Sequence, residues 1–311
     1  MNYNGDNDTI LTNLRSLDLE TSSVEEILDL YRSIDRQFFL VNELKKGTRI
    51  LRARIWDEIP NIPTNICELS YNPSPSKYFG RAHCVGDMIF YGSINPDDLK
   101  VRDYFNAPLE VLHINKEEIG RKYFVISSWV LQRNIIVASI GTTLPHAKLF
   151  QEKRGRTIKS FKGLDENFRS EALKFDDFIC AEFSKVIKDD DLDHYYKFSA
   201  TYSKFILEHG IDGILYPSVA SNGGGINVAI RKELIDSQVL IPEHALYGTF
   251  FNRYKEVTQE YSMFAETFGA EGEIRWKESY RDLLNPSIKN YYIGKSDINP
   301  LAQRISYTSL D

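Results

Sequence analysis

The sequence has few cysteines and none in a paired motif. Only Cys67, Cys84 and Cys180 occur among its 311 residues, and they lie far apart without a CxxC spacing. Neither a zinc site nor a disulfide framework is indicated, so no metal is expected. Low cysteine usage of this kind fits a reducing compartment, and we predict a cytoplasmic site of action.

The sequence also lacks long apolar runs and an excess of basic residues. No run approaches the roughly 18 residues that a membrane-spanning helix needs. The polar, acidic start MNYNGDNDTILTNL has neither the basic nor the apolar region of a secretory signal. The formal net charge of −6 argues against broad attraction to nucleic acid, because phosphate backbones require a basic surface. We therefore expect neither a membrane nor a nucleic acid as partner.

Common catalytic and nucleotide-binding motifs are missing as well. The glycine turn SNGGG (221–225) lacks the Lys-Ser/Thr of a P-loop and the G-x-G-x-x-G of a dinucleotide-binding turn. No G-x-S-x-G elbow surrounds Ser218, which gives little support to a hydrolase nucleophile there.

The composition is that of a folded chain, with 42% hydrophobic residues, 18 Tyr and 18 Phe. Helical spacing occurs in 23–45, 166–187 and 193–210, where Gly210 ends the last helix. Strands are predicted at 48–56, 88–93, 107–113, 211–219 and 226–230, and as a pair at 122–129 and 134–140. Because strands and helices do not alternate regularly, we predict an α+β fold around a mixed or antiparallel sheet.

The same pattern predicts three parts along the chain. Residues 1–45 would form a helical N-terminal extension, loosely structured to about residue 20, with Ser23 and Glu26 spaced as a capping box. Residues 46–245 would form the main domain, in which the proline-rich stretch 59–76 is an extended loop. Residues 246–311 would form an appendage wrapped around that domain.

Polar residues next to predicted strands are the candidate functional groups. Arg52 and Arg54 alternate on one strand, as solvent-exposed residues or as an anion clamp, since guanidinium binds phosphate oxygens bidentately. His83, in the glycine-flanked run GRAHCVG, is a structural hydrogen-bonding residue or a catalyst. Glu110 lies in the apolar run APLEVLH, where a carboxylate must face solvent or hold a partner.

Taken together, the order of these segments resembles the RES domain family, named for its Arg, Glu and Ser residues. The matching segments cover roughly residues 46–242. They are ILRAR (50–54), GRAHCVG (80–86), MIFYGS (88–93), APLE (107–110), DGILYPSV (212–219) and INVAI (226–230). The resemblance implies a sheet similar to that of ADP-ribosyltransferase toxins, and NAD⁺ as the substrate.

The resemblance also assigns roles to residues. It implies catalytic roles for Glu110, Arg52 and Ser218, and contacts with NAD⁺ from a larger set: Arg52, Arg54 (a register alternative to Arg52), Arg81, His83, Tyr91, Ser218 and Asn227. His83 replaces the family asparagine, and the segment between Tyr91 and Glu110 is longer than in compact members. The implied partners are phosphate as a co-substrate and an inhibitory antitoxin or immunity protein. A homo-oligomer is a separate expectation.

Three functions follow as alternatives. The first is a bacterial toxin or delivered effector that cleaves the nicotinamide–ribose bond of NAD⁺, as a glycohydrolase or a phosphorylase. The second is a mono-ADP-ribosyltransferase that modifies a protein or a nucleotide. The third is a non-catalytic nucleotide-binding module, in which His83 marks a site that has lost its activity.

Overall fold

A computed structural model describes residues 7–34, 40–56, 62–94, 120–140, 165–185, 187, 190–218, 226–253 and 256–277. The chain forms two compact units, each built from three stretches of sequence. The first unit comprises Met1–Lys45, Asn72–Tyr91 and Asn134–Leu234, and the second comprises Lys46–Tyr71, Gly92–Arg133 and Ile235–Asp311. The three-part division expected from the sequence, with boundaries at 45 and 245, stays a prediction.

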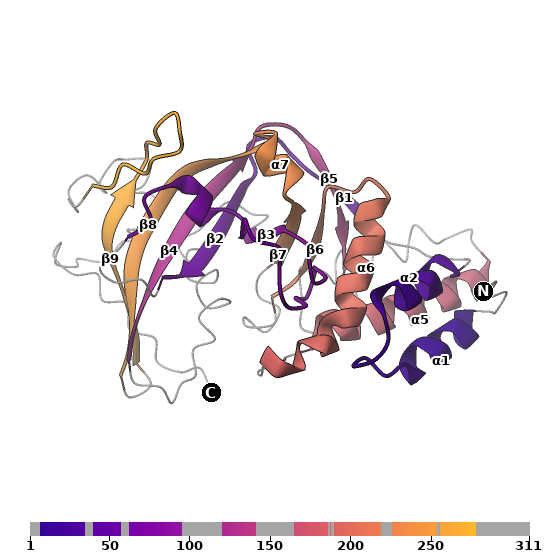
Figure 1. Ribbon diagram of the computed structural model, residues 1–311. Coiled ribbons are helices and arrows are strands. Elements are labelled where there is room, and N and C mark those ends of the chain that lie inside the picture. Colours follow the sequence, from indigo (N-terminus) through magenta and orange to yellow (C-terminus); the bar gives the residue numbers. More distant parts are fainter. Residues whose placement is uncertain are drawn as a thin grey trace. The chain divides into compact units, whose positions relative to one another are not determined.

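The first unit combines helices with a mixed sheet, as Figure 1 shows. Its strands follow the order β1-β5-β6-β7-β3, in which β5 and β6 are parallel while β1–β5 and β6–β7 are antiparallel. These strands are β1 (Leu40–Leu44), β5 (Ile135–Ser139), β6 (Gly213–Pro217), β7 (Ile226–Arg231) and the start of β3 (Ile89–Ile94). The predicted combination of α and β structure around a mixed sheet is therefore confirmed.

The helices of the first unit pack around a core rich in aromatic residues. They are α1 (Asn7–Ser16), α2 (Val24–Arg32), α5 (Glu166–Phe183), α6 (Lys197–Glu208) and the 3₁₀ helix η2 (Asp190–Tyr196). The short α7 (Glu233–Asp236) follows β7 and is divided between the two units. Tyr31 is fully buried against the rings of Phe175 and Tyr202, and its hydroxyl donates to the Phe198 carbonyl at 3.1 Å. Rings that meet edge to face add to the free energy of burial.

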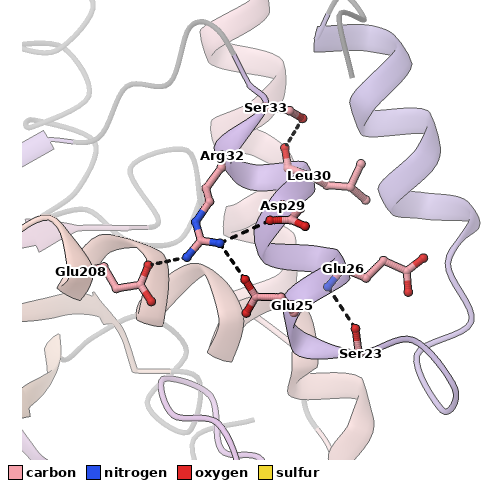
Figure 2. A network of polar contacts seen from close by, with 8 residues as sticks. All are labelled: Ser23, Glu25, Glu26, Asp29, Leu30, Arg32, Ser33 and Glu208. Atoms are coloured by element: carbon pink, nitrogen blue, oxygen red, sulfur yellow. Dashed lines mark hydrogen bonds and ion pairs between the residues drawn. The ribbon is translucent and has the colours of Figure 1, made fainter. Parts of the chain in front are cut away.

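Local sequence explains where α2 and α6 begin or end. The Ser23 hydroxyl accepts a hydrogen bond from the Glu26 amide at 3.1 Å, as the capping spacing predicts. Gly210 has φ +79°, a left-handed conformation that glycine adopts without cost, and it follows the end of α6. On the surface, Arg32 of α2 joins Glu25 and Asp29 to Glu208 of α6 (Figure 2).

Two expectations for the N-terminal part are wrong. Residues 7–16 form α1 instead of a loose segment, because Ile10, Leu11 and Leu14 recur at helical spacing and are buried. Helical structure, predicted as one or two helices to residue 45, ends in α2 at Arg32, and β1 forms at 40–44. In β1 half-buried and exposed residues alternate, and its backbone pairs with β5, so long-range pairing decides the structure of this short apolar run.

The second unit is an antiparallel sheet in the order β3-β2-β4-β8-β9, to which β3 contributes its last residues. Its other strands are β2 (Arg49–Ile55), β4 (Gly120–Leu131), β8 (Leu240–Arg253) and β9 (Glu256–Ala265). The stretch from 246 onward, expected to be an appendage, supplies part of β8 and all of β9. The 3₁₀ helix η1 (Ile66–Leu69) interrupts the predicted proline-rich loop, capped reciprocally by Asn65 and Glu68.

The predicted pairing of 122–129 with 134–140 is also wrong, although both segments are strands. β4 pairs with β2 and β8, whereas β5 pairs with β1 and β6. The turn between β4 and β5 does not close a hairpin, since Gln132 donates instead to the Val239 carbonyl at 2.8 Å. The segments predicted at 107–113 and 221–225 lie outside the described residues.

Within the described ranges, no helix is long and apolar enough to cross a membrane.

Candidate functional site

The GRAH segment of the first unit forms a tight turn just before β3. The backbones of Gly80 and His83 hydrogen-bond to each other in both directions, at 3.0 and 3.4 Å. The His83 ring lies directly over Gly80: a Cβ at position 80 would come within 2.2 Å of the His83 Cε1 atom. Only glycine fits at position 80 while the ring stays in place.

Hydrogen bonds hold the His83 ring at both nitrogens. Nδ1 lies 2.6 Å from the Tyr91 hydroxyl oxygen, and Nε2 lies 3.0 Å from Ser76 Oγ. The Tyr91 hydroxyl also accepts from the Ala82 amide at 3.0 Å, and Ser76 Oγ donates to the Tyr78 carbonyl at 2.7 Å. Tyr91 of β3 therefore fixes the turn to the sheet.

These contacts fit a neutral His83 that carries its proton on Nε2. In that form Tyr91 donates to Nδ1, and Nε2–H donates to Ser76. Burial lowers the pKa of His83 and raises that of Tyr91, which favours the uncharged form of both groups. His83 thus has a clear structural role in shaping the turn.

The following residues close the loop. Gly86 has φ +89° and donates to the Ser76 carbonyl at 2.8 Å, while the Asp87 carboxylate accepts from the Cys84 amide at 2.9 Å. Burial raises the pKa of the Cys84 thiol to about 12. A thiol with that pKa stays protonated at neutral pH and is a poor nucleophile.

Arg81, at the tip of the turn, is held by residues from distant parts of the first unit. Its Nη2 donates to the Lys185 carbonyl at 2.8 Å, just beyond the end of α5. Its guanidinium carbon lies 5.5 Å from the ring centre of Tyr196 and 6.0 Å from that of Tyr216. Cation–π attraction to two rings and a hydrogen bond to a backbone carbonyl together restrict the side chain.

One N–H of Arg81 makes no hydrogen bond within the described part of the chain. Its Nε is buried and has no hydrogen-bond acceptor among the described residues. Within the same residues, no carboxylate forms an ion pair with the Arg81 guanidinium, whose contacts are the Lys185 carbonyl and the two tyrosines. A half-buried cation with an unused N–H is a fitting partner for an anionic ligand.

The segment 193–197 contacts Phe79, the residue before the turn, and the sequence did not predict this role. The Asp193 carboxylate accepts from the Phe79 amide at 2.6 Å. Lys197 is buried, donates to the carbonyls of Leu19 and Ser22, and lies 5.4 Å from the Phe79 ring centre. The run DHYYK gave one signal, since adjacent tyrosines at a helix start combine ring surface with a polar edge.

Other predicted residues of the first unit lie on β6 and β7. Ser218 directly follows β6 and is 2% exposed, and Asn227 of β7 is 5% exposed and pairs in register with Tyr216. Because the Tyr216 ring contacts Arg81, β6 brings the DGILYPSV segment to the turn. The structure therefore brings Arg81, His83 and Tyr91 together next to Tyr216.

The two arginines of β2 belong to the second unit. Arg54 donates to the Glu68 carbonyl at 2.6 Å and lies 5.9 Å from the Trp56 ring centre. Arg52 is half-buried, and its carbonyl accepts from the Ser127 hydroxyl at 3.4 Å. Glu110 lies outside the described residues. The assignment of Arg52, Arg54 and Glu110 to one site with Arg81 stays a prediction.

No group of three or more His, Cys, Asp or Glu residues that fits a metal ion occurs in the described part of the chain. The sequence matches no protein-family model and no curated protein.

Proposed function

We propose that the chain cleaves the nicotinamide–ribose bond of NAD⁺, as a glycohydrolase or a phosphorylase. The observation that carries this proposal is the state of Arg81 in the turn GRAH. Its side chain is held by Lys185 and two tyrosines, and its buried Nε has no acceptor among the described residues. Such a group suits a pyrophosphate, whose oxygens accept hydrogen bonds from a guanidinium.

The surroundings of Arg81 support a dinucleotide over a simple anion. The turn is fixed to β3 through Tyr91, which limits the motion that would otherwise oppose binding. Ser218 and Asn227 lie at the ends of β6 and β7, beside Tyr216, and are proposed to contact ribose or phosphate. His83 shapes the turn through Tyr91 and Ser76, so its presence in place of asparagine does not argue for a lost activity.

The proposed chemistry needs charge placement more than a strong acid. Breaking the bond between nicotinamide and ribose develops positive charge on the sugar, as in glycoside hydrolysis. Nicotinamide leaves as a neutral pyridine, whose ring nitrogen keeps the electron pair of the broken bond. Glu110 is the proposed carboxylate that stabilises the sugar cation, and Ser218 is proposed to orient the substrate rather than to attack it.

The deciding experiment is incubation of the purified chain with NAD⁺, with and without phosphate, followed by mass spectrometry. A glycohydrolase yields nicotinamide and ADP-ribose, and a phosphorylase yields ADP-ribose 1″-phosphate only when phosphate is present. ADP-ribose attached to a macromolecule would indicate a transferase. Binding without release of nicotinamide would contradict the proposed cleavage, and growth arrest on induced expression is a companion test of toxicity.

The variant Glu110→Gln tests the proposed role of the Glu110 carboxylate. It keeps the shape of the side chain and removes its charge, so we expect turnover to fall about 10²-fold or more, roughly 3 kcal/mol in the barrier. Circular dichroism would check that the variant folds. Wild-type turnover in a folded Glu110→Gln protein would remove this residue from the site.

A further inference from the structure

Glu182, near the end of α5, is a buried carboxylate that the proposed chemistry does not use. The residue is 7% exposed, and its Oε2 forms an ion pair with the Lys185 ammonium group at 2.5 Å. Burial raises the pKa of this carboxyl, while Lys185 opposes that rise. The helical period of α5 could have predicted that Glu182 is buried. Phe175, Phe178 and Ile179 precede it on the same buried face.

Lys185 links this carboxylate to the candidate site. Its side chain pairs with Glu182 and lies 5.9 Å from the ring centre of Phe198, while its backbone carbonyl accepts from Arg81 Nη2 at 2.8 Å. Beyond Phe183 the helical hydrogen-bonding pattern ends, so this carbonyl is not fixed by an α-helical ladder. The ion pair fixes the residue whose carbonyl holds Arg81.

The net charge of Glu182, Lys185 and Arg81 is located on Arg81. Glu182 offsets the charge of Lys185, and neither residue supplies a carboxylate to Arg81. The cluster therefore keeps one net positive charge, located on the group whose Nε has no acceptor among the described residues. An anion at Arg81 would meet that charge without a competing carboxylate.

We propose that Glu182 is a positioning residue, which sets the geometry of Arg81 toward an anionic ligand through Lys185. This proposal rests on the proposed function for the nature of the ligand, a pyrophosphate-containing nucleotide. It does not require that the chain cleave anything. Glu182 touches no ligand in this arrangement, so its removal changes affinity through the placement of Arg81.

The test is calorimetric titration of the full chain with ADP-ribose and, separately, with inorganic pyrophosphate. We expect Glu182→Gln to weaken binding of both roughly five- to tenfold, as the loss of one charged contact would. Glu182→Asp, which keeps the charge, should recover part of this loss. Glu166→Gln is the matched control, because Glu166 pairs with Arg169 in the same i, i+3 spacing at the other end of α5.

A double-mutant cycle separates positioning from a general loss of stability. Arg81→Lys should weaken binding by itself, and Glu182→Gln in that background should add nothing, because the group that it positions has gone. Additive losses, or wild-type affinity in Glu182→Gln, would overturn the proposal. If pyrophosphate and ADP-ribose bind as expected but NAD⁺ is not cleaved, the proposed function fails while the role of Glu182 stands.

Discussion

The turn 80–83 of the first unit and the β2–β8 region of the second unit each contain a half-buried arginine, but the two differ in how their charge is balanced. Arg49 of β2 makes two 2.7 Å bonds to the Glu243 carboxylate and holds the pKa of that group below its usual value. Arg81 has a carbonyl and two rings for neighbours and no carboxylate among the described residues. We expect the paired Arg49 to act within the fold, and we propose that Arg81 is the arginine that binds a ligand.

The largest expected effect comes from replacing each of these two arginines by alanine, in separate variants. Arg81→Ala should weaken ADP-ribose binding about 100-fold or more, because a charge-assisted contact in a partly buried site is lost. Arg49→Ala should leave that affinity unchanged and lower the free energy of unfolding by about 1 kcal/mol, since its side chain is 37% exposed. Titration calorimetry and urea unfolding of both variants measure the two quantities.

The proposed difference between the two arginines would be wrong if Arg49→Ala weakened ADP-ribose binding as much as Arg81→Ala does. Equal affinity of Arg81→Ala and wild type would likewise remove Arg81 from the site. Because Arg81 also binds the Lys185 carbonyl, just beyond the end of α5, its alanine variant should lose some stability as well, and the affinity must be measured well below its unfolding temperature.

A second prediction concerns the shape of the turn itself. Gly80→Ala places a Cβ 2.2 Å from the His83 ring, which two hydrogen bonds hold in place. Moving the ring should cost about 2–4 kcal/mol of unfolding free energy and weaken ADP-ribose binding through the displaced Arg81. Gly86→Ala is the control: it has no atom within 4 Å of the new Cβ, and its cost, about 1–2 kcal/mol, comes from φ +89° alone.

The double variant Gly80→Ala, His83→Ala makes this test specific. Without the imidazole the new methyl group meets no ring, so the second substitution should recover part of the loss caused by the first. A Gly80→Ala protein as stable as wild type would show that the His83 ring is not held as described.

The sequence indicated the loop around residues 80–83, but it did not predict the distant residues that contact Arg81. Gly80, Arg81 and Tyr91 stand close together in the chain, and their local pattern of glycines before an apolar strand carries the prediction. The Lys185 carbonyl and the Tyr196 ring come from more than 100 residues away. A backbone carbonyl has no sequence signature, because every residue has one.

The dependence on distant residues also explains why β1 was predicted as helix. The run LVNEL is too short for its period to distinguish a helix from a strand, and its partner β5 lies almost 100 residues further on. By contrast, β2, β3, β6 and β7 were predicted near their observed bounds, since glycine, proline or charged residues flank each apolar run. Pairing between distant strands, such as β4 with β8, cannot be predicted from a local sequence pattern.

A third prediction uses pH to separate the turn from the rest of the fold. Burial lowers the pKa of His83 despite the Asp87 carboxylate, so the folded state favours its neutral form. The stability that this gives is fully present above the unfolded pKa of about 6.5 and is lost as pH falls toward the lower folded value. His83→Asn should therefore flatten the fall of unfolding free energy below pH 6.5, in urea titrations at several pH values.

The buried His244 of the second unit acts in the same direction, with a pKa lowered to about 4, and remains in both proteins. Only the difference between wild type and His83→Asn reports on His83. Parallel curves for the two proteins would show that His83 titrates normally and that its ring is solvated.

The smallest expected effect belongs to Arg32, the opposite extreme from Arg81. It has three carboxylates around it, from Glu25, Asp29 and Glu208, yet its side chain is 44% exposed (Figure 2). Water and salt screen such pairs, so Arg32→Gln should cost less than about 1 kcal/mol of unfolding free energy and leave ADP-ribose affinity unchanged. The loss should shrink further at about 1 M salt, where the screening length falls to a few ångströms. A loss above 2 kcal/mol that persists in salt would mean that the number of neighbouring carboxylates, rather than burial, governs what an arginine contributes here.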